Sequence, residues 1–108
     1  MSGKRSLDQN KIFHCFCAEI SDYLTANNAR CSPAMVKELV KMLLGNTSVF
    51  MSTKIAMPTS SYRRSDEDLT EQEMKAGIIS FDELLNKTIV WAATDLNLEL
   101  KSINEIAA

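Results

Sequence analysis

Residues 4–24, KRSLDQNKIFHCFCAEISDYL, decide the fold prediction, because their apolar side chains recur at helical spacing. One stripe of the expected helix contains Phe13, Phe16, Cys17, Ile20 and Leu24. Apolar residues three and four positions apart lie on one face of a helix, which packs against a core. The pattern predicts a helix from residue 7 to about residue 26. Asn27 and Asn28 favour its end there, because asparagine tolerates the left-handed conformation.

The start of this helix carries signals for a cap and for an anion. Ser6 is a favourable N-cap, and Gln9 follows three residues later, so S-x-x-Q forms a capping-box pattern. Lys4 and Arg5 stand just before the cap, where the first backbone amides of a helix lack internal partners. This combination predicts a phosphate contact at the helix start.

The same stretch resembles a known protein family. R-S-L-D-Q-N followed by an apolar, aromatic helix is similar to the opening motif of the NinB (Orf) family of phage recombination proteins. The residues that carry this similarity are Arg5, Gln9, Asn10 and His14. A second block resembles the closing helix and short extended tail of that family, through Phe81, Leu85, Trp91, Ala92 and Leu98.

Members of this family bind single-stranded DNA, dimerise and assist the loading of a recombinase. The resemblance therefore implies a bacteriophage or prophage recombination mediator that binds single-stranded DNA. It also implies a homodimer, with a host recombinase or single-strand-binding protein as a further partner.

The length and charge of the chain limit how it can bind DNA. A chain of 108 residues forms one compact domain, so we expect a single unit over residues 1–108. The formal net charge is −2, which excludes a histone-like polycation. Any binding to nucleic acid must come from a local basic patch, which a homodimer would double.

The composition also suggests a compartment. No apolar run approaches the roughly 20 residues that span a bilayer, and no apolar segment follows Lys4 and Arg5 as in a secretory signal. We therefore expect no membrane partner. The chain has three cysteines, an odd number that argues against a disulfide framework and favours the cytoplasm, here that of a host cell.

The second expected helix has clear boundaries. Ser32 is an N-cap, Pro33 occupies the first helical position, and Gly45 with Asn46 closes the far end. The side chains between them are apolar around most of the helix circumference. The side that faces solvent is expected to consist of Lys37, Glu38 and Lys41. Such a short apolar helix should be buried on two sides, by its own chain or by a second subunit.

After the second helix the spacing of apolar residues changes from helical to alternating. Alternating apolar residues over 48–57 predict one strand or a small hairpin, ended by Pro58. Residues 59–68, TSSYRRSDED, contain no aliphatic side chain and predict an exposed, mobile loop at about 59–69.

A third, longest helix is expected after this loop. Thr70 and Glu73 form a second capping box, and an apolar repeat continues to Ala92. Gly77 allows a break, after which Ser80 would cap a restarted helix. After this helix we expect a brief strand over residues 98–100, pairing with the 48–57 segment.

Catalytic and metal sites are not favoured by the residues. His14 and Cys17 are neighbours on a helix, but Cys17 lies on the core stripe, where cysteine acts as a small hydrophobe. The H-C-x-C pattern points its cysteines to different helix faces, unlike a structural zinc site. The acidic residues at 66–73 lie in a loop and a helix start, where carboxylates are solvated or complement the dipole. We predict no enzyme, no metal and no cofactor.

Nucleic-acid binding is the best supported function. Tyr62 beside an arginine pair is an arrangement that stacks a base in single-strand binders. The competing interpretation is that Arg63 and Arg64 neutralise the adjacent acidic residues, and that the motif at the first helix organises the fold. The predicted DNA-binding residues are Lys4, Arg5, Gln9, Asn10, Lys11, His14, Tyr62, Arg63 and Arg64.

The sequence thus predicts a small α+β domain, mostly α, with three main helices and one or two short strands, as an intertwined homodimer. The favoured function is a phage recombination accessory protein that binds single-stranded DNA and assists recombinase loading. The alternatives are a small phage protein-interaction module that acts on a host protein without DNA, and a nuclease subunit.

Overall fold

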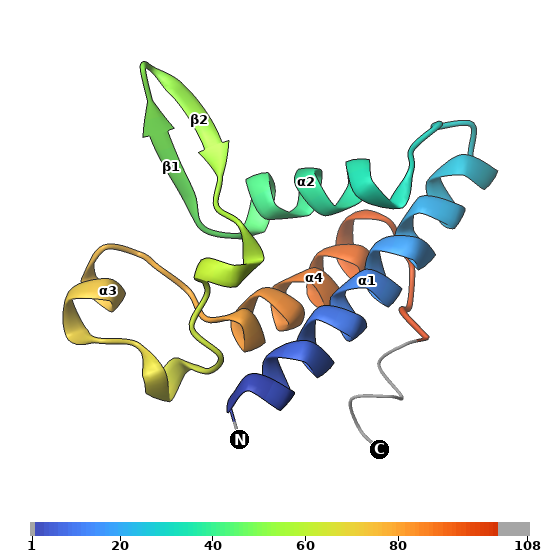
Figure 1. Cartoon of the computed structure of the whole chain (residues 1–108). Coiled ribbons are helices and arrows are strands. Elements are labelled where there is room, and N and C mark those ends of the chain that lie inside the picture. Colours follow the sequence, from blue (N-terminus) through green and yellow to red (C-terminus); the bar gives the residue numbers. More distant parts are fainter. Residues whose placement is uncertain (1, 102–108) are drawn as a thin grey trace.

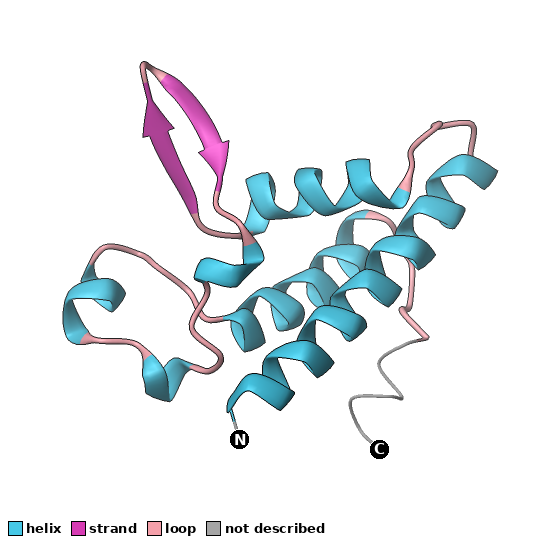
Figure 2. Ribbon diagram, viewed as in Figure 1, coloured by secondary structure: helices cyan, strands magenta, loops and turns pink. Residues whose placement is uncertain are grey.

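The computed structural model describes the backbone of residues 2–101 and the side chains of residues 9–101. The elements follow the order α1 (Ser2–Ala26), α2 (Pro33–Leu44), β1 (Thr47–Phe50), β2 (Thr53–Ala56), η1 (Thr59–Ser61), η2 (Asp66–Asp68), α3 (Glu71–Lys75) and α4 (Phe81–Asp95). The helices α1, α2 and α4 pack together, and the β1–β2 hairpin projects away from them (Figures 1 and 2). The fold is α+β and mostly α, as predicted.

Helix α1 is longer than predicted at its start and ends where predicted. It begins at Ser2, so Ser6 lies inside the helix, and the predicted N-cap with its capping box to Gln9 is wrong. Each residue added to an existing helix gains a hydrogen bond, and no proline precedes Ser6 to stop this extension. At the other end Asn28 has φ of 70°, the left-handed conformation expected there.

The caps of α2 are confirmed, but its surroundings differ from the prediction. The Ser32 hydroxyl accepts a hydrogen bond from the Met35 amide, and Pro33 is the first helical residue. Lys41, expected in solvent, is buried, and its ammonium lies 3.1 Å from a Glu38 carboxylate oxygen. The chain itself does not bury α2 on two sides, because one row remains exposed: Met35, Leu39 and Leu43. Burial of that row by a second subunit stays a prediction.

The core lies between α1, α2 and α4. Phe13 of α1 meets Phe81 of α4 edge to face, with ring centroids 5.8 Å apart and planes at 87°. The predicted stripe of α1 is confirmed, because Phe13, Phe16, Cys17 and Ile20 are buried and Leu24 packs against them. The other buried apolar residues are Val36, Val40, Leu84, Leu85, Ala92 and Leu100.

The 48–57 segment is a hairpin. Its strands β1 and β2 are antiparallel, with Thr47 opposite Ala56 and Phe50 opposite Thr53. Met51 and Ser52 connect them with φ of 50° and 67°, the twist that suits a two-residue hairpin turn.

The predicted loop at 59–69 is more ordered than expected. It contains the short helices η1 and η2, and Tyr62 and Arg64 are partly buried in it. The description of this segment as an exposed loop is wrong for these two side chains, because one packs against Phe81 and the other turns toward Asp68.

The third predicted helix is divided in two, which confirms the break allowed at Gly77. Gly77 has φ of 82°, a conformation that glycine adopts without steric cost. Thr70 and Glu73 form the predicted capping box of α3, and Ser80 caps α4 through the Glu83 amide.

The expected strand over 98–100 is absent from the described residues, and the hairpin pairs only with itself there. The chain instead folds back after α4, as the Leu98 amide donates to the Ala92 carbonyl over 2.9 Å. Leu100 then enters the core, and the Lys101 amide donates to a Glu19 carboxylate oxygen. Burial of one leucine therefore fixes this segment without strand pairing. None of the described helices has the length and apolar character needed to cross a bilayer.

Candidate nucleic-acid interface

Gln9 joins three segments that are distant in the sequence. Its side-chain amide nitrogen donates to the Arg64 carbonyl over 2.9 Å and to an Asp82 carboxylate oxygen over 2.5 Å. Gln9 is buried, although it lies near the start of α1. The N-terminal part of α1 therefore lies beside residues 63–64 and beside the first turn of α4. Of the residues that the sequence proposed for DNA contact, Gln9 and Arg64 are thus in direct contact.

The remaining residues of α1 differ in exposure. Lys11 and His14 are exposed, and Asn10 is half-buried. Residues four positions apart share a helix face, so Asn10 and His14 lie near each other on α1. The side chains of Lys4 and Arg5 lie outside the described residues, and the predictions for them remain predictions.

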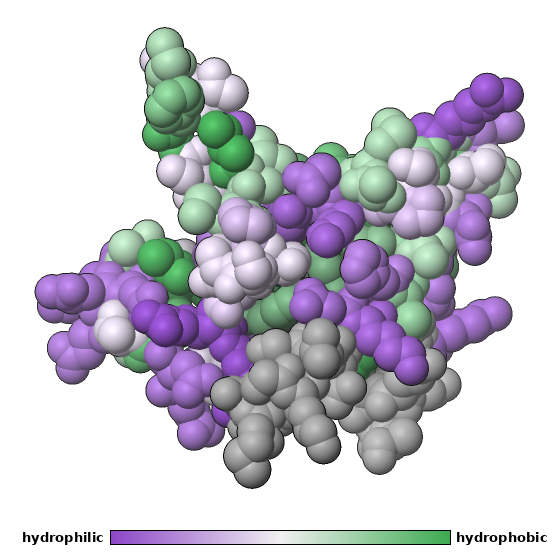
Figure 3. Space-filling model, in the orientation of Figure 1, coloured by the Kyte–Doolittle hydropathy of each residue, from purple (hydrophilic) through white to green (hydrophobic). Residues whose placement is uncertain are grey.

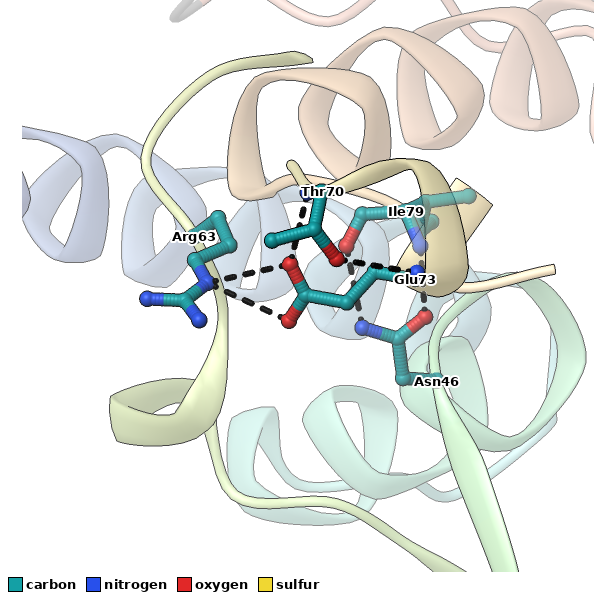
Figure 4. A network of polar contacts seen from close by, with 5 residues as sticks. All are labelled: Asn46, Arg63, Thr70, Glu73 and Ile79. Atoms are coloured by element: carbon teal, nitrogen blue, oxygen red, sulfur yellow. Dashed lines mark hydrogen bonds and ion pairs between the residues drawn. The ribbon is translucent and has the colours of Figure 1, made fainter. Parts of the chain in front are cut away.

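Arg63 presents part of its guanidinium to solvent. Its Nε atom lies 3.2 Å from a Glu73 carboxylate oxygen, and its side chain is 52% exposed. In Figure 4 the contacts to Glu73 run from Nε alone, and none is drawn from the two terminal nitrogens of Arg63. These nitrogens form the donor fork that matches an oxyanion. The ion pair with Glu73 orients the arginine and leaves that fork accessible.

Glu73 is held in its charged form. The Thr70 amide donates to it over 2.9 Å within the capping box, and Arg63 lies on its other side. The hydrogen bond from Thr70 is the main cause of a lowered pKa for Glu73, and Arg63 adds to this effect. The carboxylate that neutralises Arg63 comes from α3, and the sequence had suggested only residues 66–68 for this role.

Arg64 plays a different role from Arg63. Its side chain is only 16% exposed, and its Nη2 atom lies 3.8 Å from an Asp68 carboxylate oxygen. Its carbonyl accepts hydrogen bonds from Gln9 and from the Asp82 amide. Among the described residues, Arg64 Nε and Nη1 and Gln9 Oε1 are buried without a hydrogen-bond partner. The predicted exposure of Arg64 is wrong, and its backbone carbonyl is part of the framework.

Tyr62 is also part of the framework. Its hydroxyl accepts a hydrogen bond from the Asn46 amide over 2.7 Å, and its ring lies 5.8 Å from Phe81. Burial raises the pKa of Tyr62, and the hydrogen bond from Asn46 partly offsets this effect. The ring is thus half-buried against the core, and its predicted exposure for base stacking is wrong in the free protein.

Sequence reasoning missed the residues that hold this interface in place. Asn46 contacts Ile79 through both ends of its side-chain amide, and Asp82 accepts from Gln9. The only sequence signal at Asn46 was its place after Gly45 at a helix end, which suggests a cap and does not identify a distant partner.

Cys17 and His14, near neighbours in the sequence, differ in their surroundings. Cys17 is buried, and burial raises its pKa to about 12, so the thiol stays neutral, whereas His14 is exposed. No group of three or more metal-ligating side chains converges among the described residues.

Comparisons with known proteins add no assignment, because no family model, curated protein or solved structure matches this chain.

Proposed function

We propose that this protein binds single-stranded DNA as a homodimer and acts as a phage recombination accessory protein that assists recombinase loading. The observation that carries the proposal is the hydrogen bond from Gln9 to the Arg64 carbonyl. It holds the N-terminal part of α1, through its buried residue Gln9, against the backbone of residue 64, next to Arg63. In this proposal Arg63 and Lys11, about fifty residues apart in the sequence, contact phosphates of the same strand.

The chemistry of these residues supports phosphate as the ligand. Arg63 offers an oriented donor fork, and Lys11 adds an exposed positive charge on α1. His14 and Asn10 offer hydrogen-bonding groups on the same helix. Phosphate contacts act locally, so a net charge of −2 is compatible with such a site.

The resemblance to the NinB family supports the same function independently of the charged residues. Gln9 belongs to the first block of similarity, and Phe81 and Leu85 of the second block lie in α4, beside Asp82. Binding to a recombinase or a single-strand-binding protein, and action in the host cytoplasm, are parts of the proposal that follow from this resemblance.

The experiment that tests DNA binding is fluorescence anisotropy with labelled single-stranded and double-stranded oligonucleotides. It is carried out at 50 mM and 200 mM salt, with and without magnesium. We expect binding to single strands that weakens at the higher salt concentration, because phosphate contacts release counterions. Absence of binding at low salt would contradict the proposal, and magnesium-dependent cleavage would point to a nuclease instead.

A second candidate function is a protein-interaction module that acts on a host protein without DNA. The exposed row of Met35, Leu39 and Leu43 on α2 favours it, because such a row suits the groove of a partner. Binding of this kind depends little on salt. Absence of any oligonucleotide binding at low salt would favour this second candidate.

A further inference from the structure

The hairpin combines exposed apolar side chains with open strand edges. Figure 3 shows hydrophobic surface on the projecting hairpin. Val49 is 72% exposed, Phe50 64% and Ile55 44%. The sheet has only two strands among the described residues, so neither strand has a partner on its outer edge there. An isolated two-stranded hairpin is at best marginally stable in water, and open edges are templates for pairing with another chain.

The two edges differ in how they are protected. β2 carries Lys54, and a charged residue on an edge strand opposes pairing with another strand. β1, with the sequence TSVF, carries no charge and no proline. Two copies of β1 can therefore lie side by side without bringing like charges together, which favours a second copy of this chain as the occupant of this edge.

The hydrogen-bond pattern shows which groups of β1 face outward. The Met57 amide donates to the Asn46 carbonyl, so this pair is hydrogen bonded across the hairpin. Bonded and non-bonded pairs alternate in an antiparallel ladder. Ser48 and Phe50 therefore bond toward β2, whereas the amides and carbonyls of Thr47 and Val49 point away from it.

We infer that this protein dimerises through the β1 edge, with two copies of β1 antiparallel about a two-fold axis at Ser48. Thr47 of each copy then pairs with Val49 of the other copy, which satisfies the outward amides and carbonyls of both strands. The product is a four-stranded antiparallel sheet, which meets the requirement of three or more strands with an apolar face for independent stability.

The apolar side chains agree with this register. Residues directly opposite each other share a face, so Ser48, Phe50 and Ile55 lie on the same side of the hairpin. At the axis the two small Ser48 side chains face each other. Each Phe50 then lies opposite Asn46 of the other copy and diagonal to its Ser48, so its ring loses part of its exposed apolar surface.

This self-association deepens the homodimer of the proposed function and rests on it, but the two can fail separately. A monomer that binds single-stranded DNA would contradict the homodimer and its β1 pairing, and would leave the DNA proposal standing. A dimer without affinity for DNA would contradict the DNA proposal alone.

The first test uses light scattering after size-exclusion chromatography. The wild-type protein is expected at twice the 12.1 kDa mass of the chain. Val49→Pro removes an outward amide without removing a hairpin hydrogen bond, so this variant is expected at the mass of one chain. Lys54→Pro is the matched control, because it removes the outward amide of the other edge, and it is expected to remain a dimer. A monomeric wild type, a dimeric Val49→Pro variant or oligomers larger than a dimer would overturn the inference.

The second test does not depend on the folding of a proline variant. Non-bonded antiparallel pairs have Cα atoms about 4.5 Å apart, within the range of a disulfide. Ser48→Cys is therefore expected to form a covalent dimer under mild oxidation. Thr53→Cys, on β2, lies one strand further from the axis and is expected to stay uncrosslinked. Equal crosslinking of both variants and the wild type, or no crosslinking of Ser48→Cys, would overturn the inference.

Discussion

Asn46 and Ile79, 33 positions apart, exchange two hydrogen bonds. The Asn46 side chain donates to the Ile79 carbonyl over 2.9 Å and accepts from the Ile79 amide over 2.8 Å (Figure 4). The Asn46 side chain thus pairs with the backbone amide and carbonyl of one residue, as a residue of a neighbouring antiparallel strand would. The Asn46 amide also donates to the Tyr62 hydroxyl, so this residue ties the end of α2 to residues 62–79. These contacts fix the path of the chain that presents Arg63.

Tyr62→Phe should lower the free energy of unfolding on the order of 1 kcal/mol, because the part-buried Asn46 amide loses its acceptor. Urea denaturation followed by circular dichroism measures this change. The matched control is Tyr23→Phe, since no hydrogen bond to the Tyr23 hydroxyl occurs among the described residues. Equal effects of the two substitutions would contradict the role given to Tyr62.

Gly45→Ala should destabilise the protein by about 1–3 kcal/mol, the range typical of overpacking. A Cβ atom at residue 45 would clash with the Tyr62 hydroxyl and lie 2.9 Å from the Lys41 carbonyl. In a Tyr62→Phe background part of this clash disappears, so the two substitutions should not be additive. Strict additivity in a double-mutant cycle would contradict the close approach.

Stability should fall in acid partly through Glu73. Its pKa is lowered in the folded protein, chiefly by the Thr70 amide. A group of this kind contributes stability above its unfolded pKa, about 4.3 for glutamate, and loses it as the pH falls through the folded value. Glu73→Gln should therefore reduce the loss of stability measured by denaturation between pH 5 and pH 3. An unchanged pH dependence would show that Glu73 is not held as the structure indicates.

Cys17 should resist alkylation in the folded protein. Burial raises its pKa to about 12, and the reactive species is the thiolate. With iodoacetamide at pH 8, peptide mass spectrometry should show modification of Cys15 and Cys31, which are partly exposed, well before Cys17. Labelling of Cys17 at the rate of the other two would contradict its burial.

The sequence was sufficient wherever local rules decide the structure. Ser32, Thr70 and Ser80 are caps as predicted, because a cap depends on residues three positions away. The break at Gly77 follows from the conformational freedom of one residue. The predicted start of α1 was wrong, because a residue that favours the N-cap position, such as Ser6, does not prevent further helical turns before it.

The candidate interface was only partly predictable, because long-range contacts decide it. Gln9 was selected correctly as a motif residue, but its bond to the Arg64 carbonyl spans 55 positions. The difference between Arg63 and Arg64 depends on which side of the chain faces Glu73 and which faces Asp68. Two adjacent arginines give no sequence signal that separates an accessible donor fork from a buried one.

The salt dependence of single-stranded DNA affinity tests the central claim most directly. It is compared between the wild type, Arg63→Ala and Arg30→Ala. Arg30 is an exposed arginine after the C-terminal end of α1. Its replacement by alanine changes the net charge by the same amount as Arg63→Ala. Loss of one phosphate contact should reduce the slope of log affinity against log salt by about 0.7. We predict this reduction for Arg63→Ala and an unchanged slope for Arg30→Ala; equal slopes for both variants, or no salt-dependent binding by the wild type, would contradict the account.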